Sequence, residues 1–133
     1  MADVAVDWTE ELTLLKADLS TDLAADLDEC VAAANAEDVS ELVAASGGKK
    51  TKCGLVGTGS TLTVTLDGKL GQGPCSKKGT GAYVGNKVST PFVGEYTVEV
   101  SRISVKITDP AGKVVFKGKG LEKGLTGTWT VKF

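Results

Sequence analysis

The sequence contains no histidine and only three cysteines in 133 residues. Without histidine it lacks the usual general base at neutral pH and the commonest nitrogen ligand for zinc. Cys30, Cys53 and Cys75 are widely spaced and form no C-x-x-C pair, which excludes the pattern of a closed structural zinc site. We therefore expect no metal, no cofactor and no catalytic residues, and we interpret the chain as non-enzymatic.

The three thiols leave two alternatives open. Cys53 and Cys75 could form a disulfide around a glycine-rich segment, with Cys30 left as an odd residue on the buried side of a helix. In the other alternative, all three are free thiols in a reducing compartment.

Long hydrophobic runs are also absent. Residues 1–12, MADVAVDWTEEL, have neither the basic start nor the apolar centre of a secretory signal. No segment reaches the length that a membrane-spanning helix needs. The sequence as written predicts a cytoplasmic protein without a transmembrane segment, and secretion by a signal-independent route stays open.

Charges of opposite sign are concentrated in different parts of the chain, although the net charge is only −2. Residues 1–48 hold twelve acids and one base, a formal charge of −11. Residues 49–133 hold fourteen bases and five acids, a formal charge of +9. The length and the 41% apolar content fit one domain over 1–133, made of an acidic segment at 1–48 and a basic, glycine-rich segment at 49–133.

The acidic segment has the pattern of an amphipathic helix. Its apolar residues recur every three or four positions from 8 to 34, which places them on one face of a helix. Ser20-Thr21-Asp22 could restart a helix, so both one long helix and a pair of helices are open. A further short helix is expected from about Asp38 to Gly47-Gly48.

The basic segment has the alternating pattern of antiparallel strands. Segments 68–81 and 118–127 are so rich in glycine that we interpret them as loops. The stretches GEYTVEV (94–100) and GTWTVKF (127–133) read alike and predict two strands with the same inward alternation. Opposite charges at Glu99 and Lys132 would suit neighbouring strands.

These elements together predict an α+β fold. An N-terminal amphipathic helix or helix pair would pack on a C-terminal antiparallel β-sandwich or partly open barrel of about five to seven strands. The helices are expected to cover part of the sheet, because their leucine stripe would otherwise face water.

One glycine-rich stretch of the basic segment carries the candidate binding residues. They are Lys69, Lys77, Lys78 and Lys87, with Tyr83 as the only aromatic residue among them. A basic loop of this kind fits an acidic protein, a glycan or an anionic surface. Nucleic acid is a disfavoured partner, because the acidic segment would repel phosphate and one aromatic residue makes no stacking platform.

The sequence therefore predicts a non-enzymatic binding module that uses the basic, glycine-rich loops of its β segment. The alternative is a β domain masked by a displaceable acidic helical arm, an autoinhibited binder of polyanions or nucleic acid. A thiol-dependent or carboxylate-dependent enzyme ranks below both, with Cys75 as its best nucleophile because lysines follow it closely. The oligomeric state does not follow from the sequence.

Overall fold

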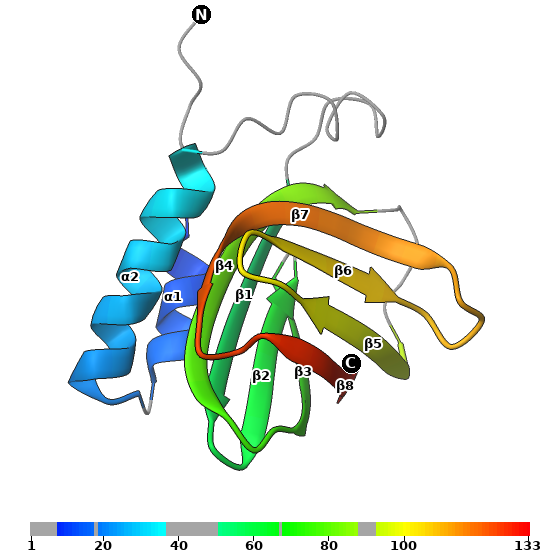
Figure 1. The fold of residues 1–133 in the computed structure, drawn as a ribbon, viewed down its shortest axis with the longest axis horizontal. Coiled ribbons are helices and arrows are strands. Elements are labelled where there is room, and N and C mark those ends of the chain that lie inside the picture. The colour runs from blue at the N-terminus through cyan, green and yellow to red at the C-terminus, as the bar shows by residue number, and fades with distance from the viewer. Residues whose placement is uncertain (1–7, 18, 37–50, 67, 88–92) are drawn as a thin grey trace, which may run out of the picture.

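The computed structural model describes residues 8–17, 19–36, 51–66, 68–87 and 93–133. In this part of the chain two helices precede eight strands (Figure 1). The fold is α+β with an antiparallel sheet, as the sequence predicts.

The helical segment is a pair of helices, α1 (Thr9–Lys16) and α2 (Thr21–Ala36). The hydroxyl oxygen of Ser20 accepts a hydrogen bond from the Leu23 amide at 3.3 Å, which satisfies one of the free amides at the start of α2. The two-helix alternative is therefore confirmed. The further helix expected from about Asp38 lies outside the described residues. Neither of the two helices is both long and apolar enough to span a membrane.

The strands of the described residues form a closed antiparallel barrel in the order β1-β2-β3-β8-β5-β6-β7-β4, with β4 paired to β1. Their bounds are β1 (Thr51–Thr58), β2 (Thr61–Leu66), β3 (Lys69–Pro74), β4 (Lys78–Lys87), β5 (Glu95–Val100), β6 (Ser104–Thr108), β7 (Val114–Lys123) and β8 (Gly127–Lys132). The expected sandwich or partly open barrel of five to seven strands is thus corrected to a closed barrel of eight.

Two segments predicted as loops are largely strands. The expected loop at 68–81 contains β3 and the start of β4, and the expected loop at 118–127 contains the end of β7. These residues supply strand pairs, β2 with β3 and β4 with β7, that the closed barrel requires.

Glycine in these strands allows close approach between neighbouring backbones. A Cβ atom on Gly73 of β3 would overlap the carbonyl oxygen of Thr130 in β8. A Cβ atom on Gly120 of β7 would likewise overlap the carbonyl oxygen of Ala82 in β4. A glycine inside a strand often marks such a contact rather than a loop. This is why the loop predictions for 68–81 and 118–127 are wrong.

The two similar stretches of the sequence are neighbouring strands, β5 and β8. Tyr96 lies opposite Val131, and both side chains are buried. Glu95, rather than Glu99, lies opposite Lys132. The expected adjacency of the two strands is confirmed, and in the observed register Lys132 lies opposite Glu95 instead of Glu99.

The barrel contains one very short β-ladder, between β3 and β8. These strands share a single register pair, Gln72 with Lys132, whereas β2 and β3 pair along their whole length. The ring of Phe133 packs against Gly71 at this junction, at 2.9 Å from where a Cβ atom would lie. Side-chain packing therefore supplements a sparse set of backbone hydrogen bonds here.

Apolar side chains form two clusters, one inside the barrel and one between the barrel and the helices. The inner cluster is built around fully buried Tyr83 and Phe116. The outer cluster combines Trp8, Leu15, Leu27, Cys30, Val31 and Ala34 of the helical segment with Val56, Ala82 and Val84 of β1 and β4.

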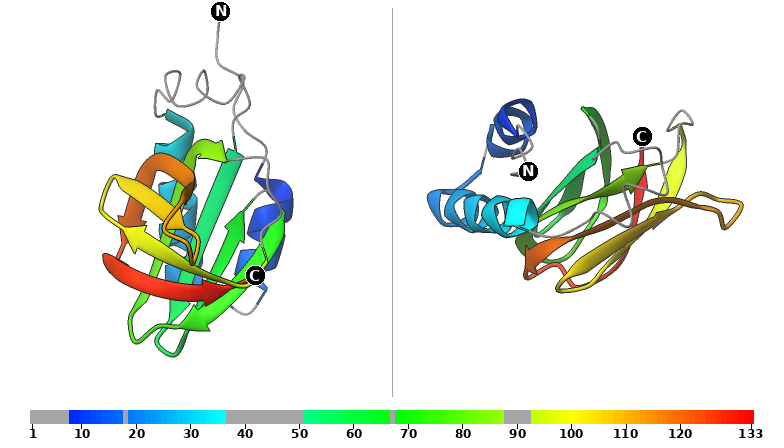
Figure 2. Two further views of the ribbon diagram at one scale, coloured as in Figure 1. Left: turned by 90° about the vertical axis from the view of Figure 1, so that its right-hand side faces the viewer. Right: turned by 90° about the horizontal axis from the view of Figure 1, so that it is seen from above.

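Both helices lie on one side of the barrel (Figure 2), where α2 packs on β4 and on β7. We call this side the covered face. The bare face is the outer surface of β5, β6, β8 and residues 114–119 of β7.

Candidate binding face

The lysines singled out in the sequence do not form one site. Lys69 begins β3, whereas Lys77 and Lys78 follow its far end, and a six-residue strand separates its ends by about 17–20 Å. The Lys77 ammonium is already engaged: it donates to the Thr126 carbonyl oxygen at 2.8 Å and lies 5.8 Å from the centre of the Trp129 ring. The structure brings Lys77 and Lys78 together and leaves Lys69 at the other end of the barrel.

The two remaining candidates contribute little to a surface. Tyr83 lies inside the barrel with 0% of its area exposed, and its hydroxyl donates to the Ser101 carbonyl oxygen at 2.7 Å. Burial raises the pKa of Tyr83, so the phenol stays protonated. Lys87 is the last residue of β4, and its side chain lies outside the described part of the chain.

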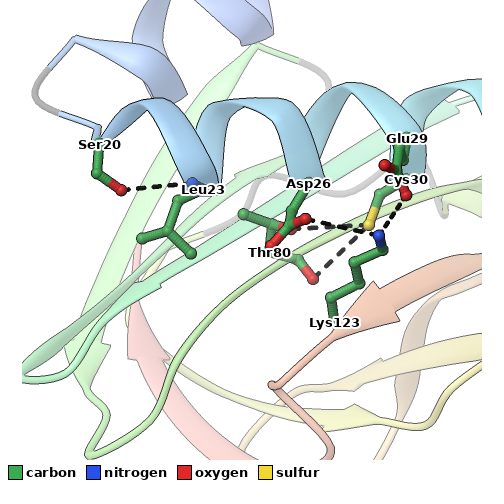
Figure 3. A network of polar contacts seen from close by, with 7 residues as sticks. All are labelled: Ser20, Leu23, Asp26, Glu29, Cys30, Thr80 and Lys123. Carbon is green, nitrogen blue, oxygen red and sulfur yellow. Dashed lines mark hydrogen bonds and ion pairs between the residues drawn. The ribbon is translucent and has the colours of Figure 1, made fainter.

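Acids of the helical segment neutralise two barrel lysines on the covered face. The Lys123 ammonium lies between the carboxylates of Asp26 (3.5 Å) and Glu29 of α2 (Figure 3). The hydrogen bond from Lys123 to Glu29 raises the pKa of Lys123, whereas desolvation acts in the opposite direction. Lys52 of β1 pairs with the buried carboxylate of Glu11 at 3.0 Å. The acidic helices therefore dock on the basic barrel through ion pairs as well as through apolar packing.

A group of cationic side chains remains uncovered beside this docked pair of helices. We define the β6–β7 face as the outward residues Ser104, Lys106, Lys117 and Lys119 of β6 and β7, together with the exposed residues Arg102 and Ile103 of the turn before β6. Lys117 and Lys119 are exposed and alternate along β7, so they point to the same side of the sheet. In the register of the two strands, Lys117 lies opposite Lys106 and Lys119 lies opposite Ser104.

Two of the charges of this face are not balanced by acids of the described residues. Lys106 pairs with Glu99 at 3.1 Å. Among the residues that the structure describes, no acid lies within ion-pairing distance of Lys117 or Lys119. A depression of about 290 Å³ opens between β6 and β7, lined by Ser104, Val105, Lys106, Lys117, Gly118 and Lys119. The face thus presents two free ammonium groups on a rigid sheet.

Sequence reasoning missed the β6–β7 face because the stretch KGKG at 117–120 was assigned mostly to a loop. The signal was present: lysine at every second position, with glycine between, is the alternation of a strand with one polar face. The glycines between the lysines obscured it.

The thiols lie inside the protein. Cys30, Cys53 and Cys75 are free and buried, so Cys53 and Cys75 form no disulfide in this structure. Burial raises the pKa of Cys30 and of Cys53. The Cys75 thiol, 3% exposed, donates to the Lys77 carbonyl oxygen at 3.5 Å. Within the described ranges, no group of three or more cysteine or acidic side chains is placed to hold a metal ion.

No protein-family model, no curated protein and no solved structure matches this chain.

Proposed function

We propose that this protein is a non-enzymatic binding module whose β6–β7 face contacts an acidic surface of another protein. The observation that carries the proposal is the pair Lys117 and Lys119, two exposed cations on adjacent outward positions of one strand without acidic partners among the described residues. Clustered charge of one sign on a rigid scaffold attracts and orients a partner of opposite sign.

The composition of the face favours carboxylates over bases or sugars. Its six residues include no aromatic side chain, so a nucleobase or a sugar ring would find no stacking platform there. The negative helices α1 and α2 lie beside it on the covered face, and they disfavour a long polyanion that extends across the molecule. A compact acidic patch fits better.

The alternative, a barrel masked by a displaceable helical arm, is less well supported. Displacing the helices would expose Val56, Ala82 and Val84, which are at most 3% exposed in the docked state. It would also break the Glu11–Lys52 ion pair. Burial of several apolar side chains, each worth about 1.5–3 kcal/mol, favours a permanent cover.

Two matched double variants test the proposal. Lys117→Gln/Lys119→Gln removes two charges from the β6–β7 face, and Lys77→Gln/Lys78→Gln removes two charges from the site that the sequence predicted. Binding of a short, fluorescently labelled oligoglutamate to the full chain is measured by anisotropy at low and at physiological salt. Because an exposed ion pair contributes up to about 1 kcal/mol, we expect Lys117→Gln/Lys119→Gln to weaken binding roughly three- to thirtyfold.

The control variant separates a defined face from a general effect of charge. Both variants have the same net charge, so equal weakening by the two would contradict a specific β6–β7 face. Stronger weakening by Lys77→Gln/Lys78→Gln would move the site to the β3–β4 connection. Wild-type binding should weaken as salt rises, because the contacts are exposed to solvent.

A further inference from the structure

Strand β7 carries a row of outward residues that is half covered. The alternate positions Lys117, Lys119, Leu121 and Lys123 point to the outside of the barrel. Helix α2 covers the second half of the row, where Leu121 packs against the outer apolar cluster and Lys123 lies between two carboxylates. The first half, Lys117 and Lys119, is exposed.

The covered half shows which chemistry this row accepts. Asp26 and Glu29 are three residues apart on α2, so their side chains leave the same side of the helix, and both reach the Lys123 ammonium (Figure 3). Leu27 and Cys30 of the same helix turns are fully buried against the barrel. The covered half of β7 therefore binds an amphipathic helix whose carboxylates lie beside its apolar stripe.

The uncovered half offers the same combination of groups. Ile103 is 65% exposed, and its carbonyl oxygen accepts a hydrogen bond from the Gly120 amide at 3.0 Å. This bond holds the backbone of Ile103 beside Gly120 of β7, one residue before Ser104, which lies opposite Lys119. The Arg102 carbonyl oxygen accepts from the Glu122 amide at 3.2 Å in the same way. The turn that ends the surface with the two free cations thus carries an exposed apolar residue.

The spacing of the cations suits a helix. Alternate residues of a strand are about 6.8 Å apart along its axis, and residues i and i+4 of an α-helix are about 6 Å apart. An extended peptide that adds to a sheet edge is excluded here, because β6 pairs with β5 and β7, and β7 pairs with β6 and β4. Strands with two neighbours leave no free edge.

We propose that the partner of the β6–β7 face is an amphipathic acidic helix of another protein. It would lie on the bare face next to α2, with two carboxylates one turn apart on Lys117 and Lys119 and an apolar side chain on Ile103. This inference rests on the proposed function, and it names the class of acidic partner.

Two alanine-based helical peptides of identical composition serve as probes. In the first, two glutamates four residues apart and one leucine share a face of the helix. In the second, the same residues are distributed around it. Binding to the full chain is measured by fluorescence anisotropy, with amide chemical shifts as the readout of position. We expect the first peptide to bind roughly tenfold more tightly, in keeping with two exposed ion pairs and one apolar contact, and to shift the amides of Lys117 and Lys119.

Variants then assign the preference to the face. Lys117→Gln/Lys119→Gln should remove most of the difference between the peptides, and Lys77→Gln/Lys78→Gln should preserve it. Ile103→Ala should lower the affinity for the first peptide several-fold. Val93→Ala is its matched control, because Val93 is also an exposed apolar residue, at 74%.

The outcomes separate this inference from the proposed function. If both peptides bind equally and Lys117→Gln/Lys119→Gln weakens the binding of both, the acidic-partner proposal stands and the inference of a helical partner is wrong. If the first peptide binds better but independently of Lys117 and Lys119, the helix has another site and this inference is overturned. If binding of neither the helical peptides nor the oligoglutamate depends on these lysines, both proposals are overturned.

Discussion

The covered and bare faces of the barrel are built from strands with the same alternation, yet their outward residues differ in kind. Under the helices the outward residues are Val56, Ala82 and Val84, with Thr65 fully buried as well. On the bare face they are mainly threonine, lysine and glutamate. The inward residues make the barrel in both regions. The outward residues decide whether a strand surface receives a helix of the same chain or stays exposed to solvent.

The ion pairs of the two faces give the sharpest contrast. On the covered face, Lys52→Met leaves the Glu11 carboxylate, which is 1% exposed, without its cation at 3.0 Å. We expect a loss of about 3–5 kcal/mol in the free energy of unfolding, because an unpaired buried charge is costly. On the bare face, Lys106→Met breaks a pair whose side chains are 44% and 47% exposed, and the loss should stay below about 1 kcal/mol. Urea unfolding of the two variants measures the difference, and equal losses would contradict the contrast.

Apolar residues of the helices should differ in the same way. Leu27→Ala removes a fully buried side chain from the outer cluster, and such truncations cost about 2–5 kcal/mol. Leu14→Ala, on the neighbouring helix, alters a side chain that is 42% exposed, and its effect should be within about 0.5 kcal/mol. Thermal unfolding followed by circular dichroism compares the two. A small effect of Leu27→Ala would mean that the helices contribute little to stability.

The buried thiols predict a loss of stability at alkaline pH. Burial raises the pKa of Cys53 inside the barrel and of Cys30 under α2 above their ordinary value of 9.0. The folded state therefore keeps these protons at a pH where the unfolded chain releases them. Their contribution is present below pH 9.0 and is lost as pH rises above it, with a slope of at most about 1.4 kcal/mol per pH unit for each thiol until its folded-state pKa is reached.

Urea unfolding at a series of pH values tests this dependence. Cys53→Ala and Cys30→Ala should each make the decline in the free energy of unfolding above pH 9 shallower. Cys53→Ala reports on the inside of the barrel, and Cys30→Ala reports on the covered face. An unchanged slope in both variants would assign the alkaline loss to other groups, Tyr83 and Lys123 among them, since their pKa values are raised as well.

The smallest effect on stability is expected on the β6–β7 face. Lys117→Gln/Lys119→Gln alters exposed side chains that have no acidic partner among the described residues, so the free energy of unfolding should change by less than about 0.5 kcal/mol. A gain is compatible with the proposal, because like charges repel across two residues of a strand. A loss comparable to that of Lys52→Met would identify a structural role for the two lysines and count against a binding role.

The sequence predicted the fold well where one side chain type alternates with another. The strand at 61–66 and the adjacency of β5 and β8 follow from such alternation. The closure of the barrel could not be predicted, because it depends on Gly73 and Gly120 as points of close backbone approach, and glycine in a single sequence equally indicates a loop.

The sequence predicted a basic candidate site, and the structure separates the residues predicted for it. Lysines among glycines do mark the basic surface, but the lysines at 69 and 77–78 are separated by the length of β3, and Tyr83 is inside the barrel. Which lysines stay free depends on where the acidic helices dock, since Asp26 and Glu29 hold Lys123 while Lys117 stays exposed. That selection is a tertiary effect that no local pattern contains.

The single register pair between β3 and β8 has a consequence for how the barrel fluctuates. A ring of hydrogen-bonded strands opens first at its shortest ladder, since separation there breaks the fewest bonds. Here the junction of Gln72 with Lys132 is that ladder, whereas the long β4–β7 ladder lies on the far side of the ring. Amide protons of β3 should therefore exchange with solvent through partial opening, while those of β4 and β7 exchange only when the whole molecule unfolds.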